Sequence, residues 1–131
     1  MLRLLKISAP CAVALYLAGC SSSKSTGMAC TEEFRYGLAV YVNDSLTNTP
    51  IASGASLVAR DGTYKDSVAF PSARPDLDPY ALNSAGERAG TYQLTVTRPG
   101  YLARLKNNVR VTANVCHVNG VSVTARLVPT T

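Results

Sequence analysis

Few side chains in this sequence combine the residue types and spacings that catalysis requires. His117 is the only histidine among the 131 residues, and Glu87 precedes a strand that is expected to begin at Gly90. Either side chain could act as a general acid or base, so a hydrolase is the one catalytic hypothesis that stays open. Neither a Ser/His/Asp set nor a glycine-rich phosphate loop accompanies them. We therefore expect no enzyme, no catalytic residue and no cofactor.

The amino end has the pattern of an export signal. Arg3 and Lys6 precede an apolar run over residues 7–18. As a helix this run would be ~18 Å long, against a hydrocarbon core of roughly 30 Å, so it is too short for a permanent membrane span. It ends in the sequence LAGC at residues 17–20. This ending resembles the lipobox of bacterial lipoproteins, in which an aliphatic and two small residues precede a cysteine.

The resemblance implies that residues 1–19 form a helical signal peptide, that the mature chain begins at Cys20, and that the Cys20 thiol carries a lipid. More than one acyl chain would anchor it stably, because each buried methylene contributes ~0.8 kcal/mol. Serines and not an aspartate directly follow Cys20, which favours the periplasmic side of the outer membrane if the host has two membranes. The alternatives are an ordinary secretory signal that is cut nearby, or a buried helix, and both predict a soluble protein. Residues 20–29 would form a flexible tether.

Two cysteines remain if Cys11 is removed with the signal and Cys20 is lipidated. Cys30 and Cys116 would then share an oxidising compartment, and a disulfide between them is the simplest expectation. It would join the start of the first strand to the start of the last. A redox pair or a metal site is the alternative, but the chain has no CxxC motif and His117 is the only nitrogen ligand nearby. We expect no bound metal.

Basic residues gather near the carboxyl end. Residues 20–87 carry five basic and eight acidic residues, whereas residues 88–131 carry six basic residues and no acidic ones. Arg104, Lys106 and Arg110 lie close together and could bind an anionic partner, such as an envelope polymer or a lipid head group. A solvated face balanced by carboxylates elsewhere is the alternative. A small net charge and an envelope address argue against nucleic-acid binding.

Residues 71–88 are proline-rich and are expected to form a long loop. Three of its side chains could hold a carbohydrate or a peptide: Arg74, Asp78 and Tyr80. The D-x-D pair at residues 76–78 lacks the surrounding ligands of a calcium loop, so a cation site is not expected there. Glu87 and Arg88 are expected to form an ion pair at the corner that follows the loop.

From Tyr36 onward apolar residues recur with a period of two, which predicts β-strands. These strands must position the candidate residues. Strands are expected over residues 36–43, 51–60, 63–70, 90–98 and 121–127, with two short strands inside 102–113. Asp61-Gly62 predicts a hairpin turn, and Pro99-Gly100 a type II turn.

Asn107-Asn108 predicts a turn between the two short strands, ending at Val109. That turn would place Leu105 and Val111 in the core and set Lys106 opposite Arg110. No segment of the mature chain favours an amphipathic helix.

About seven short strands predict an all-β protein with an antiparallel β-sandwich of transthyretin-like or Ig-like type over residues 30–131. Residues 37–55, with a G-x-x-V-x-V-x-D opening and a P-I-x-x-G-A continuation, resemble carboxypeptidase regulatory-like domains. So do residues 90–96 followed by Pro99-Gly100-Tyr101. The enzymatic branch of this fold, the hydroxyisourate hydrolases, uses several histidines and a carboxyl-terminal Tyr-Arg-Gly-Ser, whereas this chain ends Val-Pro-Thr-Thr.

The sequence thus predicts a non-catalytic, lipid-anchored module of the cell envelope with an interaction or structural role and an unknown ligand. The carboxypeptidase resemblance implies a scaffold or accessory role, and the expected partners are the membrane and an envelope protein or anionic polymer. The alternative is a lipoprotein that binds carbohydrate or peptide through residues 71–88. A hydrolase that uses Glu87 or His117 is the third and least favoured hypothesis.

Overall fold

The computed structural model describes residues 27–71 and 80–131, and all of their regular secondary structure is β. The strands are β1 (Tyr36–Asp44), β2 (Ser56–Asp61), β3 (Tyr64–Ala69), β4 (Leu82–Gly86), β5 (Gly90–Thr97), β6 (Arg104–Ala113), β7 (Val118–Asn119) and β8 (Val121–Leu127). Within these ranges there is no helix long and apolar enough to cross a membrane. The signal sequence and Cys20 lie outside the described residues.

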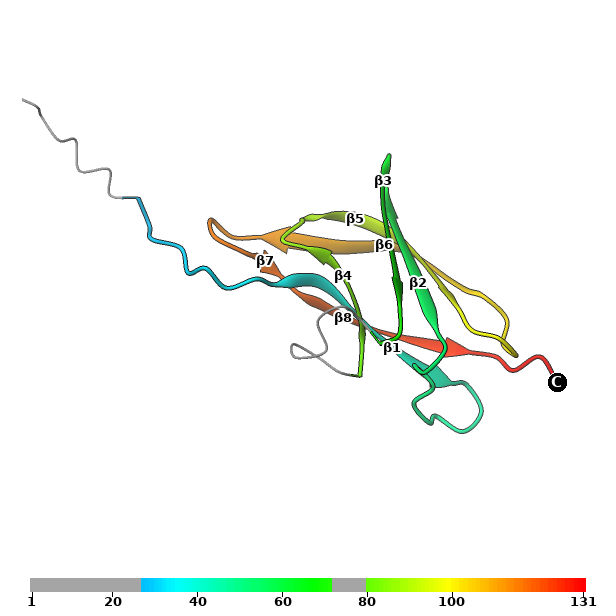
Figure 1. Cartoon of the computed structure of the whole chain (residues 1–131). Coiled ribbons are helices and arrows are strands. Elements are labelled where there is room, and N and C mark those ends of the chain that lie inside the picture. Colours follow the sequence, from blue (N-terminus) through cyan, green and yellow to red (C-terminus); the bar gives the residue numbers. More distant parts are fainter. Residues whose placement is uncertain (1–26, 72–79) are drawn as a thin grey trace, which may run out of the picture.

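Two sheets pack face to face as the β-sandwich that the sequence predicts (Figure 1). One has the order β4-β1-β8, and the other has the order β3-β2-β5-β6-β7. All neighbouring strands are antiparallel except β1 and β8, which run parallel from Leu38↔Val121 to Asp44↔Leu127. Alternation of apolar residues identifies both strands, but it carries no information about their relative direction.

The core lies between the sheets and follows the predicted alternation. β1 buries Leu38, Val40 and Val42, and β5 buries Tyr92, Leu94 and Val96, all at 2% exposure or less. Their counterparts on β8 are Val123, Ala125 and Leu127. These three predicted strand faces are confirmed.

The expected loop over residues 71–88 is wrong in its last part, because β4 forms there and pairs with β1. Ser84 and Ala85 are fully buried in this strand. The Asp66 carboxylate of β3 accepts a hydrogen bond from the Ser84 hydroxyl at 2.7 Å and from the Ala85 amide at 3.1 Å. A carboxylate from the other sheet therefore satisfies two polar groups of this buried strand.

A turn at Asn107-Asn108 is also wrong, because β6 continues through both residues. The pairing shifts by one residue between Tyr92↔Val109 and Leu94↔Lys106, which is a β-bulge. Asn108 has φ 56°, and asparagine tolerates this left-handed conformation at low cost. Asparagine, the residue type that predicts a turn here, therefore forms part of a bulge.

The hairpin and type II turns are confirmed. Gly62 has φ 58° between β2 and β3, and Gly100 has φ 83° where the Tyr101 amide donates to the Arg98 carbonyl at 3.1 Å. The strand expected over residues 51–60 begins only at Ser56. Gly54, with φ 76°, lies in a turn before it.

Different segments of the chain lie at the two ends of the sandwich (Figure 1). The entry end is where residues 27–35 reach the sandwich, and it holds the start of β1, the corner before β5 and the β6–β7 connection. The far end holds the end of β1, the Pro99-Gly100 turn and residues 128–131.

Candidate functional site

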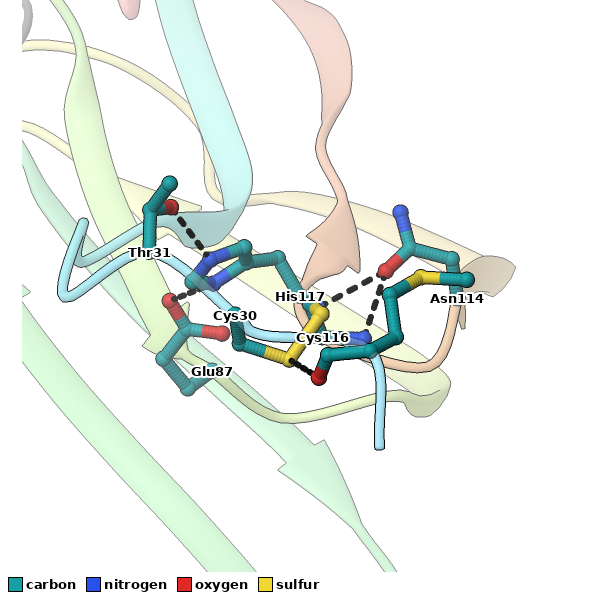
Figure 2. Close-up of a disulfide and its surroundings, with 7 residues drawn as sticks. Cys30, Thr31, Glu87, Asn114, Cys116 and His117 are labelled. Atoms are coloured by element: carbon teal, nitrogen blue, oxygen red, sulfur yellow. Dashed lines mark hydrogen bonds and ion pairs between the residues drawn. A yellow bond between two sulfur atoms is a disulfide. The ribbon is translucent and has the colours of Figure 1, made fainter. Parts of the chain in front are cut away.

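A disulfide joins Cys30 to Cys116, so this prediction is confirmed. The two Cα atoms lie 5.3 Å apart although the residues are 86 positions apart in sequence. Cys116 belongs to the connection between β6 and β7, and Cys30 precedes β1. The bond therefore fastens the incoming chain to the entry end of the sandwich (Figure 2).

The neighbouring imidazole of His117 lies between two side chains from distant parts of the chain (Figure 2). Its Nδ1 is 3.0 Å from Glu87 Oε1, and its Nε2 is 3.1 Å from Thr31 Oγ1. A carboxylate can only accept, so Nδ1 carries a proton. In the neutral ring, Nε2 then accepts a hydrogen bond from the Thr31 hydroxyl. The side chain of His117 is 11% exposed.

Glu87 receives several hydrogen bonds at this point. Its Oε1 also accepts from the Arg35 backbone amide at 2.7 Å. Partial burial favours the neutral carboxyl, but hydrogen bonds from the His117 ring and from the Arg35 and Val118 amides outweigh burial and hold the pKa of Glu87 below its usual value. Glu87 is therefore a carboxylate at neutral pH.

Asn114 fixes the loop that carries Cys116 and His117. Its side-chain Oδ1 accepts hydrogen bonds from the backbone amides of both residues at 2.8 Å. The backbone amide of Asn114 donates to the His117 carbonyl at 2.9 Å. Such side-chain capping of the backbone is the common way in which asparagine organises a tight loop. Asn114 thus fixes the backbone of the two residues that carry the sulfur and the imidazole.

Thr31, His117 and Glu87 stand in the order of a nucleophile, a base and an orienting acid. Acyl transfer also requires donors aimed at a developing oxyanion. The amides of Cys116 and His117 instead donate to Asn114, and the Arg35 amide donates to Glu87.

A shallow cavity of about 410 Å³ adjoins these residues, and its lining includes the carboxylates of Glu32, Glu33 and Glu87. Negative charges there would oppose an anionic intermediate. The arrangement suits fastening of the entering chain better than hydrolysis.

Glu87 and Arg88 do not form the expected ion pair, because each binds a different partner. The Arg88 guanidinium donates to Asp61 and to the Tyr92 hydroxyl, both at 2.9 Å, and lies 4.0 Å from the centre of the Tyr64 ring. The Tyr92 hydroxyl and the Asp61 carboxylate raise the pKa of Arg88. Adjacent residues point in opposite directions here, so Arg88 fixes the corner while Glu87 reaches His117.

The three predicted basic residues lie on β6 but not on one face. Arg104 pairs with the buried Val96 and Lys106 with the buried Leu94, so both project on the side of the sheet that carries the core. Arg110 pairs with the exposed Thr91 and projects on the solvent side.

Two details of the expected arrangement of the basic residues are therefore wrong. The bulge separates Lys106 from Arg110, which are not cross-strand partners. Leu105, expected in the core, is 53% exposed.

Of the loop candidates, Arg74, Asp78 and the D-x-D pair lie outside the described residues. Tyr80 is described and is 75% exposed. No group of three or more histidine, cysteine, aspartate or glutamate residues suited to a metal ion occurs in the part of the chain that the structure describes.

Sequence reasoning missed Thr31 and Asn114 as members of the entry-end cluster. Asn114 could have been found, since asparagine side chains commonly bond the backbone two residues further on, which here is Cys116. Thr31 carries no local signal, because only the disulfide at the adjacent Cys30 brings it to His117. In comparisons with known proteins, no family model matches this sequence, and no curated protein matches it.

Proposed function

We propose that this chain is a non-catalytic lipoprotein of the cell envelope that serves as an interaction or structural module. The observation that carries the proposal is the Cys30–Cys116 disulfide, because structural disulfides persist in exported proteins and are rare in the cytosol. The LAGC sequence ending at Cys20 adds the anchor. The attachment is to the periplasmic side of the outer membrane if the host has two membranes.

The position of the disulfide also supports an orientation. Residues 20–30 can span at most ~35 Å when fully extended, so the entry end would lie near the lipid surface. β6 and β8 both extend from that end to the far end. The long strands would thus project from the membrane and be accessible to other envelope components.

The absence of catalysis rests on the chemistry of the entry-end cluster. The backbone amides of Cys116 and His117 donate to Asn114, and the lining of the adjoining cavity includes three carboxylates. A domain without a reaction of its own fits the accessory role that the resemblance to carboxypeptidase regulatory-like domains implies.

Lipidation is tested with Cys20→Ala in the full chain, expressed in a bacterium that processes lipoproteins. We expect the natural chain to incorporate labelled palmitate and to sediment with membranes, and the variant to do neither. Cys11→Ala is the matched control, since it removes the other cysteine of the same segment and should change nothing. A Cys20→Ala protein that is still labelled and still membrane-bound would exclude the anchor.

A further inference from the structure

The larger sheet ends in a long strand edge that is almost unpaired. β6 pairs with β5 on one side, but on its other side it meets β7 only through Thr112↔Asn119 and Ala113↔Val118. Residues 104–111 have no strand partner on that side within the described ranges. An edge of this length presents unpaired amide and carbonyl groups and can pair with another extended chain.

The first half of this edge is open to solvent on both faces. All five residues from Arg104 to Asn108 are exposed, although Arg104 and Lys106 lie on the side of the sheet that elsewhere covers the core. The smaller sheet therefore does not cover this half of β6. A strand added here would contact solvent-accessible side chains on both of its faces.

The charge of the edge is uniformly positive. Arg104 and Lys106 project on one side and Arg110 on the other, and residues 88–131 contain no acidic residue. Two copies pairing antiparallel through β6 around Leu105 would set Arg104 opposite Lys106 on the same face, which is unfavourable. The same charges would favour an acidic partner strand.

We propose that the free edge of β6 binds an extended acidic segment of another envelope protein by β-strand addition. The inference rests on the proposed function as an envelope interaction module and names its partner class. A polypeptide is favoured over a lipid or polysaccharide because it alone can pair with a whole row of strand-edge amides and carbonyls. Carboxylates would meet the basic side chains.

The bulge sets the pattern that the partner should carry. Arg104 and Lys106 are two residues apart on one face, and the bulge puts Arg110 on the opposite face. A regular strand has no extra residue at the bulge. Its acidic residues should therefore be spaced by two and then by three positions, with an apolar residue opposite the exposed Leu105.

The test uses the full chain and labelled peptides of about eight residues. One peptide carries glutamates at the stated spacing, a second carries lysines there, and a third is the acidic peptide with alternate backbone amides N-methylated. We expect the first alone to bind in fluorescence anisotropy. Hydrogen exchange should slow at amides of residues 104–111 when it binds, because added strand pairs protect them.

Charge reversals define the site. Lys106→Glu and Arg110→Glu should each weaken binding of the acidic peptide by about tenfold, since each replaces an exposed attraction by a repulsion. Lys65→Glu is the matched control, because Lys65 lies on β3, the opposite edge of the same sheet. Both Lys106 and Arg110 are exposed, so these variants are expected to unfold at the same temperature as the natural chain.

Three results would overturn the inference: no binding of the acidic peptide, equal binding of its N-methylated form, or equal weakening by Lys65→Glu. Binding of phosphatidylglycerol vesicles that is lost in Arg110→Glu, without peptide binding, would assign the edge to lipid instead. Cys20→Ala should bind the peptide as the natural chain does. A failure of lipidation and a failure of peptide binding are therefore distinguishable.

Discussion

At the entry end of the sandwich a covalent bond and ionic contacts join distant segments, whereas at the far end hydrogen bonds join distant segments beside tight turns. The entry end combines the Cys30–Cys116 disulfide with the His117–Glu87 and Arg88–Asp61 pairs. Its partners are between 27 and 86 residues apart. Closure of such long loops costs chain entropy. The disulfide persists when the chain unfolds and the ion pairs do not, so the disulfide restricts the unfolded chain as well as the native one.

The far end is organised around one buried carboxylate. Asp44 accepts hydrogen bonds from the Leu46 and Thr47 amides at 2.7 and 3.0 Å, and from the Tyr101 hydroxyl at 2.9 Å. The amides of Thr47 and Leu46 are the main cause that lowers the pKa of Asp44. Two backbone bonds, Leu102 to Val128 and Thr130 to Gly100, fasten the carboxyl-terminal segment beside this turn.

The comparison shows that the two ends should respond to different treatments. Reducing agents act on the entry end, because the Cys30–Cys116 disulfide lies there. A side chain added at Gly100 strains the backbone of the far end, because this residue of the Pro99-Gly100 turn has a positive φ.

The largest effect is expected from Cys30→Ser/Cys116→Ser. Removing a crosslink between residues 86 positions apart should lower the free energy of unfolding by about 4.5 kcal/mol in the chain-entropy model. Urea unfolding of the full chain measures this change. Amide exchange should rise at residues 114–120 in the double variant and stay unchanged at Tyr101 and Leu102.

The control for this prediction is chemical reduction. Reductant should destabilise the natural chain by a similar amount and leave the double variant unaffected. A double variant as stable as the natural chain would mean that the noncovalent contacts at His117 hold the entry end by themselves. Equal increases in exchange at both ends would show that the two ends unfold as one unit.

Three strand faces of this fold could be predicted from alternation alone, because on β1, β5 and β8 one face is buried along most of the strand. β4 could not, since four consecutive residues of it are buried and its buried serine depends on Asp66 from the other sheet. The bulge in β6 was predicted as a turn because both structures use asparagine. Tertiary contacts determine whether such a segment forms a strand, a turn or a bulge, and the local sequence pattern carries no information about those contacts.

The candidate site also has one part that the sequence predicts and one part that it does not. The disulfide could be predicted by counting cysteines, which needs no geometry. The His117 partners could not, because Thr31 and Glu87 lie 86 and 30 residues away. Glu87 and Arg88 look like a pair in the sequence, but a corner of the backbone directs them to separate partners. Spacing predicts contacts within a strand or helix and fails across a corner.

A smaller effect is expected at the far end from Gly100→Ala. A Cβ atom at this position meets nothing within 4 Å, so the cost comes only from the φ of 83°. That conformation should lower the free energy of unfolding by about 1–2 kcal/mol. Ala103→Gly, in the same connection, tests added flexibility without a φ requirement and should cost less. Entry-end amides 114–120 should keep their exchange rates in Gly100→Ala.

The smallest effect at neutral pH is expected when a carboxylate at either end is replaced by its amide. Asp44 and Glu87 both have lowered pKa values in the folded chain. Each therefore stabilises the fold above its ordinary pKa, and this stability is lost as the pH falls through the folded value. Asp44→Asn and Glu87→Gln should each flatten the acid limb of the stability curve, measured by urea unfolding below about pH 5.

The disulfide should make these two amide variants unequal. At the entry end the covalent bond persists when Glu87 is neutralised, whereas at the far end Asp44 is the shared acceptor of two amides and the Tyr101 hydroxyl. Asp44→Asn should therefore flatten the acid limb more than Glu87→Gln in the oxidised chain. The difference should shrink when Glu87→Gln is combined with Cys30→Ser/Cys116→Ser. An unchanged difference would show that the disulfide and the Glu87 contacts stabilise the entry end independently of each other.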